Sequence, residues 1–238
     1  MFYRNLIFVL FFSFFLSCSD DLYVEPALKI PTINIEINNL EEISSKEDYV
    51  KGTFEFNSGD YNFEHFVQPI KIRGRGNSTW DMPKKSYQFK LEEKHNLFNF
   101  PEDKKWLMLA NYSDKTMLRN ALAFELGYLS KLDWTPNYHF AEVVINGKVK
   151  GLYQFTEKVE TGDYNRVKIG DEGFLLEVDQ LSRIDYDDIS FWTEKKLLFV
   201  VKDPDLESGS SKIKKIKSYI INTENVLYSD KFDDPING

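Results

Sequence analysis

Apolar and polar side chains alternate along most of the chain, which is the pattern of strands with one buried face. Ile33, Ile35 and Ile37 show this period of two near the start of the pattern. Asn146 and Gly147, flanked by alternating apolar residues, predict a tight hairpin turn. We expect strands at residues 31–39, 49–56, 68–74, 85–93, 104–112, 141–145, 149–156, 172–179 and 196–203.

The period changes to that of a helix in two places. Residues 113–132 form the stronger candidate, and Ser113 or Asp114 is expected to cap it. Its apolar residues at helical spacing are Met117, Leu118, Ala121, Leu122, Leu126 and Leu129. Residues 210–230 form a second amphipathic candidate. The predicted fold class is therefore α+β, a mostly antiparallel sheet with one central and one C-terminal helix.

The first residues resemble an export signal rather than part of the fold. One basic residue, Arg4, precedes an apolar run from Leu6 to Leu16, which is too short to span a bilayer. The run ends in Ser17 and Cys18, and this cysteine is the only one in the chain. Its position is that of the lipidated cysteine of a bacterial lipoprotein. An ordinary signal peptide with a cysteine there by chance is the alternative.

This interpretation divides the chain into three parts. Residues 1–17 are the expected lipoprotein signal peptide, residues 18–30 the lipidated cysteine and a tether, and residues 31–238 the folded part. We expect an exported protein, held at the outer membrane or cell surface by lipid on Cys18. The acidic residues after Cys18 resemble a tag that sends some lipoproteins to the cell surface.

Composition and charge argue against a nucleic-acid partner and against a histidine metal site. The chain has 238 residues, a formal net charge of −8 and an isoelectric point near 5.1. Such acidity argues against a nucleic-acid partner, so any anionic ligand needs a local basic cluster. His65, His95 and His139 lie far apart with no zinc-ligand spacing, and we expect no metal site from them.

The stretch "IKIRGRGNSTWDMPKKSYQFKLEE", Ile70 to Glu93, is the richest in candidate chemistry. It lacks the spacing of a phosphate-binding P-loop, and a strand rather than a helix follows it. Two interpretations stay open on the pattern alone. The stretch is either a solvated hairpin tip or a glycine-rich ribbon that covers phosphates, with lysines entering the return strand.

Three blocks together resemble the spore-coat protein H (CotH) kinase family. They are "RGRGNSTWDMPKKSYQFKL", "WLMLANYSDKTMLRNALAFEL" and "VINGKVKGLYQFTEKVE", in this order and spacing. The resemblance covers nearly all of residues 31–238. It implies part of an atypical protein-kinase-like fold that transfers phosphate from ATP, with Mg²⁺, to Ser or Thr of envelope or exported proteins.

The resemblance also implies where a nucleotide would lie. The segment around Glu157 would lie near a hinge, and Glu125 would pair with a lysine. Loop residues would be Arg73, Arg75, Asn77 and Ser78, and the phosphate-binding amine would come from Lys84, Lys85 or Lys90.

The chain departs from the family pattern at its end. Family members continue with an Asn-x-Asp block and a Trp-Asp-x-Asp block, which resemble the catalytic and metal-binding aspartates of kinases. Neither block occurs in this sequence. We therefore expect the N-terminal part of a CotH kinase-like domain, truncated before its catalytic carboxylates and inactive alone. A non-catalytic surface lipoprotein that acts as a binding or scaffold module is the alternative.

Overall fold

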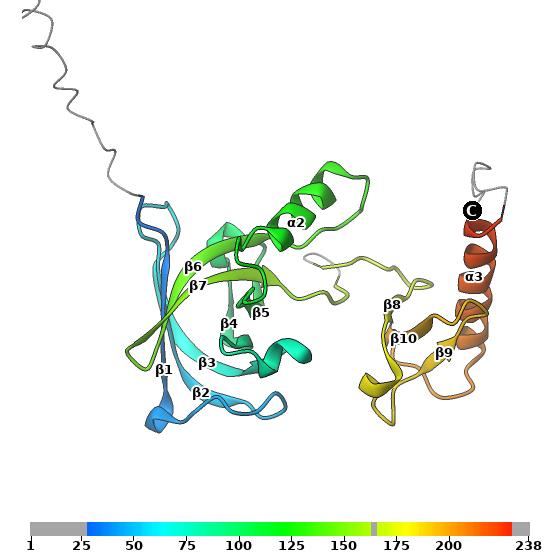
Figure 1. Cartoon of the computed structure of the whole chain (residues 1–238), viewed down its shortest axis with the longest axis horizontal. Coiled ribbons are helices and arrows are strands. Elements are labelled where there is room, and N and C mark those ends of the chain that lie inside the picture. Colours follow the sequence, from blue (N-terminus) through cyan, green and yellow to red (C-terminus); the bar gives the residue numbers. More distant parts are fainter. Residues whose placement is uncertain (1–27, 163–165, 230–238) are drawn as a thin grey trace, which may run out of the picture.

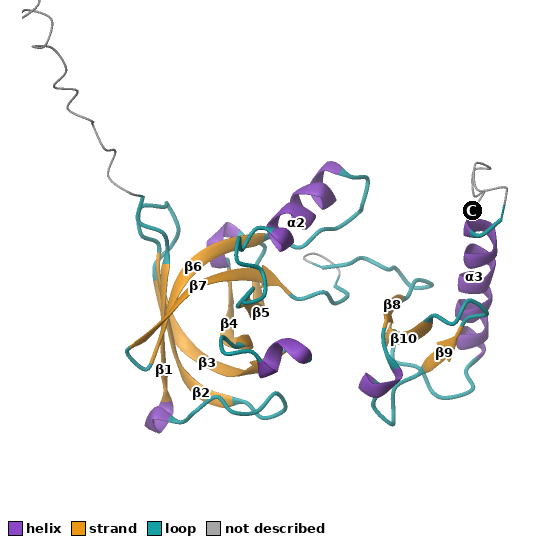
Figure 2. Ribbon diagram, in the orientation of Figure 1, coloured by secondary structure: helices purple, strands orange, loops and turns teal. Residues whose placement is uncertain are grey.

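The protein is α+β, with mostly antiparallel strands and two described α-helices, as the sequence predicts. A computed structural model describes residues 28–162 and 166–229. Figures 1 and 2 show a closed barrel with one helix near its rim, followed by a smaller sheet that carries the other helix. The expected signal peptide and Cys18 lie outside the described residues.

Seven strands form the barrel in the order β1-β2-β3-β4-β5-β7-β6. Neighbours along this order pair antiparallel, and the barrel closes where β1 runs parallel to β6, with Thr32 opposite Glu142. The bounds are β1 (Thr32–Ile37), β2 (Val50–Asn57), β3 (Phe66–Arg75), β4 (Ser86–His95), β5 (Asp103–Leu109), β6 (Tyr138–Ile145) and β7 (Lys148–Glu157). Short 3-10 helices follow β1, β3 and β4 at Asn38–Leu40, Ser78–Asp81 and Leu97–Asn99.

Aromatic side chains fill the barrel. Phe54 stacks on Phe89 with ring centroids 5.1 Å apart, and Phe56 meets Phe98 edge-on at 5.0 Å. Trp106 is fully buried among them. Phe54 and Phe56 stand at alternate positions of β2, and Phe89 and Trp106 come from β4 and β5, so the period of two in the sequence accounts for these core residues. Phe98 comes from the 3-10 helix after β4. Because the interior is packed, we look for ligand pockets at the ends of the barrel rather than inside it.

Helix α2 (Arg119–Leu129) starts later than the sequence predicts. The prediction of a helix from Ser113 is wrong because Asp114 organises a turn instead. Its carboxylate accepts hydrogen bonds from Thr116 N at 3.1 Å, Thr116 Oγ1 at 2.7 Å and Arg119 N at 2.8 Å. Met117, in the left-handed region with φ of 61°, also interrupts the helix. Asp114 thus satisfies the first helical N–H from five residues away.

The rest of the described chain forms a second, smaller unit. Its sheet has the order β8-β10-β9, from β8 (Leu175–Val178), β9 (Ser190–Trp192) and β10 (Leu198–Asp203), and a 3-10 turn (Leu181–Arg183) follows β8. Helix α3 (Ser211–Leu227) begins after Ser210, whose side chain accepts a hydrogen bond from Lys212 N. α3 buries Ile216 and Glu224, and Glu224 accepts a hydrogen bond from Thr193 at 2.7 Å. Within the described ranges, no helix is both long enough and apolar enough to cross a membrane.

Candidate functional site

The glycines between β3 and β4 have a packing role. The ring of Trp80 lies against Gly74 so closely that a Cβ there would come within 2.2 Å of it. Gly76 has a φ of 108°, which other residues rarely adopt, and a Cβ there would meet the Thr79 hydroxyl at 2.2 Å. The glycines therefore fold the tip back and place Trp80 beside β3.

Two adjacent lysines follow this tip, just before β4. The Lys84 ammonium donates to the Leu152 carbonyl and lies 4.2 Å from the centroid of the Tyr153 ring. The Lys85 ammonium donates to the Trp80 carbonyl and lies 5.1 Å from the Trp80 ring. Both cations thus rest on electron-rich ring faces, which attract positive charge. The fold turns this part of the sequence into a basic, aromatic surface.

A hollow of about 930 Å³, here called the lysine pocket, opens over these side chains. Its lysines are Lys84, Lys85, Lys148 and Lys150, and its aromatic residues are Trp80, Tyr87, Tyr112 and Tyr153. Glu41 and Glu42 also line it, so the basic residues outnumber the acidic ones. Rings with a few cations suit a ligand with a flat apolar part and an anionic part.

A second hollow of about 310 Å³, here called the arginine pocket, shares part of its lining with the lysine pocket. Arg75, Lys84 and Arg119 line it, and Lys84 and Tyr112 belong to both pockets. Desolvation lowers the pKa of the Lys84 ammonium. Desolvation also lowers the pKa of Arg75, although the carboxylate of Glu177 opposes that shift. Cations that lose hydration in this way gain from an anion placed beside them.

The structure therefore brings together three of the predicted residues, Arg75, Lys84 and Lys85, around the two pockets. Arg73 points elsewhere, because its guanidinium donates to the Glu47 carbonyl at 3.2 Å and stacks over Tyr49. The remaining three basic or polar candidates line neither pocket. Asn77 and Ser78 are exposed at the tip, and Lys90 is exposed on β4 opposite Lys71 and Lys105.

Glu125 on α2 does not pair with a lysine in the part of the chain that the structure describes. Its carboxylate accepts a hydrogen bond from the Tyr138 hydroxyl at 2.9 Å. The expected lysine–glutamate pair is therefore not formed here. Desolvation and this hydrogen bond raise the pKa of Tyr138. The contact holds α2 to the start of β6 rather than to the lysine pocket.

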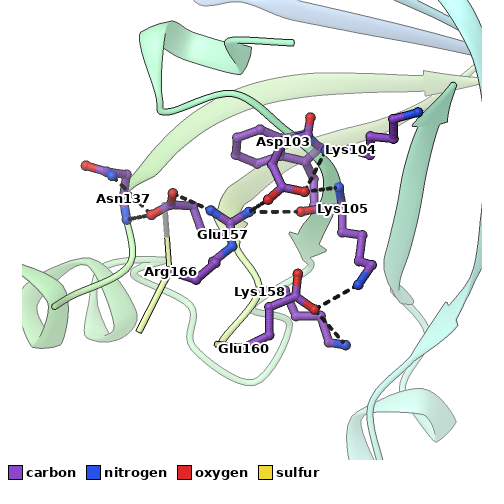
Figure 3. A network of polar contacts seen from close by, with 9 residues as sticks. Asp103, Lys104, Lys105, Asn137, Glu157, Lys158, Glu160 and Arg166 are labelled. Atoms are coloured by element: carbon purple, nitrogen blue, oxygen red, sulfur yellow. Dashed lines mark hydrogen bonds and ion pairs between the residues drawn. The ribbon is translucent and has the colours of Figure 1, made fainter. Parts of the chain in front are cut away.

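Glu157, at the end of β7, anchors a polar network that sequence reasoning missed (Figure 3). Arg166 Nη1 lies 2.8 Å from Glu157 Oε1, and Arg166 Nη2 lies 3.1 Å from Asp103 Oδ2. Asn137 donates its backbone and side-chain N–H groups to Glu157 Oε2 at 2.8 and 3.0 Å. Burial raises the pKa of the Glu157 carboxyl, and Asn137 and Arg166 oppose the shift.

This network fastens the strap, residues 158–162 and 166–168, to the barrel. Glu160 on the strap lies 3.0 Å from Lys105 Nζ and 3.5 Å from Lys158 Nζ (Figure 3). Beyond it, Thr161 donates a hydrogen bond to Asp203 of the smaller sheet. The strap therefore contacts both units. The sequence indicated this network only in part. The family resemblance placed the segment around Glu157 near a hinge, but no motif marks Arg166 as its partner.

Magnesium ligation was the other implied chemistry. Among residues 28–162 and 166–229, no group of three His, Cys, Asp or Glu side chains is arranged to hold a metal ion. The one carboxylate in the arginine pocket, Asp114, is engaged by Thr116 and Arg119. Hydrogen bonds lower its pKa. The arginine pocket thus offers an anionic ligand three cationic side chains and a single carboxylate that is already engaged.

The fold and pockets define a class: an α+β protein with a packed barrel and a basic, aromatic site beside its β3–β4 hairpin. The sequence profile described as CotH kinase protein matches residues 72–237, which is more than half of the chain. The chain therefore belongs to the CotH kinase family. The match begins in β3 and includes both lysines, both pocket arginines and the strap. No curated protein sequence matches the chain.

Proposed function

We propose that the lysine and arginine pockets together bind ATP, as the nucleotide site of a CotH-type kinase acting on Ser or Thr of envelope or exported proteins. The observation that carries the proposal is the position of Lys84. Its ammonium is the cation common to both pockets and lies over the Tyr153 ring. A phosphate chain that passes from one pocket to the other would meet it. Family membership supports the same activity.

Each part of the ligand has a counterpart at this site. The rings around the lysine pocket offer faces on which a base can stack, and the lysines beside them offer point charges for phosphate oxygens. Because the chain carries a net charge of −8, this local basic cluster has to act against the overall field. Mg²⁺, when bound, would neutralise negative charge on the phosphates, and no described residue is assigned as its ligand.

Lys84→Met tests the nucleotide site, because it removes the ammonium and keeps the aliphatic stem. Isothermal titration of the full chain, purified in detergent, should show ATP affinity falling about 10- to 100-fold, as expected for losing a charge-assisted contact. Lys90→Met is the matched control, since Lys90 lies exposed on β4 outside both pockets. Equal affinities for the two variants, or no ATP binding by the parent at millimolar concentration, would refute the proposal.

We also propose that lipid on Cys18 anchors the exported protein at the outer membrane or cell surface. The support is the sequence of the first 18 residues, namely a basic residue, a short apolar run and Ser17-Cys18. Cys18→Ala should move the protein from the membrane fraction to the soluble fraction of the cells that produce it. Ser19→Ala is the control, because it leaves the cysteine in place. Unchanged partitioning of the Cys18 variant would show that lipidation is not the anchor.

A further inference from the structure

The arginine pocket has a charge pattern of its own. Two guanidinium groups and one ammonium line it, from Arg75 at the end of β3, Arg119 at the start of α2 and Lys84 between them. Asp114 is its one carboxylate. The pocket therefore keeps an excess of positive charge in a chain that is acidic overall. Arg119 was not among the residues that the sequence singled out.

The guanidinium groups keep donors available for a ligand. The Arg75 guanidinium forms no hydrogen bond or ion pair with a side chain or carbonyl in the described ranges, although the carboxylate of Glu177 acts on its charge. Arg119 Nε lies 3.8 Å from Asp114 Oδ1, near the limit for an ion pair, and its side chain is 83% exposed. The Asp114 carboxylate accepts hydrogen bonds from Thr116 and from the Arg119 backbone N–H. The carboxylate thus shapes the loop and makes one long ion pair with Arg119, whose terminal guanidinium nitrogens stay exposed.

The wall that carries Arg119 is held in place by a chain of amides. Asn111 donates to the side-chain oxygen of buried Gln154 at 2.7 Å, and Asn120 donates to the side-chain oxygen of Asn111 at 2.9 Å. Asn111 and Met117 both adopt left-handed backbone conformations, with φ of 46° and 61°. Such conformations cost free energy and persist where surrounding contacts impose them. Arg119 and Asn120 therefore line the pocket from the first turn of α2, at the end of a loop that these contacts fix.

We propose that the arginine pocket binds the terminal phosphates of a polyphosphate ligand. Arg75 and Arg119 contact phosphate oxygens from two sides, and Lys84 contacts the phosphate that precedes them. Guanidinium groups suit this role because their planar donors match two phosphate oxygens at once. The inference rests on the proposed nucleotide site and assigns its phosphate end. It also makes Arg119 a ligand-binding residue.

The test uses sodium tripolyphosphate and ATP as separate probes, titrated into the full chain in magnesium-free buffer. Arg119→Ala should weaken both probes about 10-fold or more, as expected for one lost charge-assisted contact. Arg119→Lys should fall between, because it keeps the charge and loses the planar donors. Arg183→Ala is the matched control, since Arg183 pairs with Asp179 near the smaller sheet. It should bind both probes like the parent.

Each outcome decides a different question. If Lys84→Met weakens ATP but Arg119→Ala binds like Arg183→Ala, the phosphate assignment is wrong and the nucleotide site stands. If the parent binds tripolyphosphate through Arg119 but does not bind ATP, the pocket is an anion site and the nucleotide proposal fails. Binding of neither probe refutes both. If Arg119→Ala melts at a lower temperature than the parent, a second variant decides the question. Asn120→Asp adds a negative charge to the same wall and must lower the affinity for tripolyphosphate if the assignment is correct.

Discussion

Glu157 and Arg166 form the most completely buried ion pair among the described residues. Their side chains are 0% and 2% exposed, and Asp103 contacts Arg166 while Asn137 contacts Glu157. Taking two charges out of water costs free energy that their attraction only partly offsets. Removing one partner is therefore expected to cost more free energy than the intact pair contributes, because the remaining charge stays buried with less compensation.

Glu157→Ala should lower the free energy of unfolding by about 3 kcal/mol, since Arg166 stays buried and Asp103 compensates only part of its charge. Glu160→Ala, three residues along, is the control. Glu160 pairs with Lys105 and Lys158 nearer the surface, and its loss should cost roughly 0–1 kcal/mol. Urea denaturation of the three proteins measures the difference. Similar costs for the two variants would mean that the Glu157 network does not stabilise the fold.

The sequence predicted residue types better than residue partners. Lys84, Lys85 and Arg75 follow from the basic stretch and the family resemblance, and the structure gathers them around two pockets. Arg73 shares a face of β3 with Arg75, but its guanidinium is held by the Glu47 carbonyl and the Tyr49 ring. Arg119 was missed because the pocket forms only where its own segment, residues 109–120, meets residues 75–86, which are distant in sequence. A cluster of basic residues in the sequence therefore indicates that an anion site is near, but only the fold shows which of these residues line it.

At the scale of elements, α2 differs most from its prediction. The helix buries Ala121 and Gly127, whereas the leucines at helical spacing face outward. Leu118, Leu122, Leu126 and Leu129 are 59%, 61%, 59% and 84% exposed. Apolar spacing correctly predicted a helix here, although the leucines that carry the spacing do not form its buried face. Spacing alone does not say which face is covered, because it depends on what the chain places beside the helix.

The double variant Leu122→Gln/Leu126→Gln should change the free energy of unfolding by no more than about 0.5 kcal/mol per site, because both side chains already contact water. It should also raise solubility, since it breaks an exposed apolar face. Ala121→Gln on the same helix is the control and should cost about 1–3 kcal/mol through overpacking. Thermal melts and a sedimentation assay measure both effects. A strong loss of stability in the double variant would show that this face is covered in solution.

At the scale of the whole molecule, the fold class was predictable and the closed barrel was not. Alternation in the sequence identifies most of the barrel strands, and short turns explain their antiparallel pairs. Closure depends on β1 meeting β6 in parallel, between residues more than a hundred positions apart. No local pattern encodes that contact. Strand β9 was also missed, because its three residues are too short to show a period.

The double pairing of β1 has a mechanical consequence. This strand is held by β2 on one edge and by β6 on the other, and the chain enters it at Thr32. A force applied along the strand from that end loads the bonds of both ladders together, in shear, instead of opening them one after another. The barrel can therefore bear tension that is applied at Thr32, where the chain enters it.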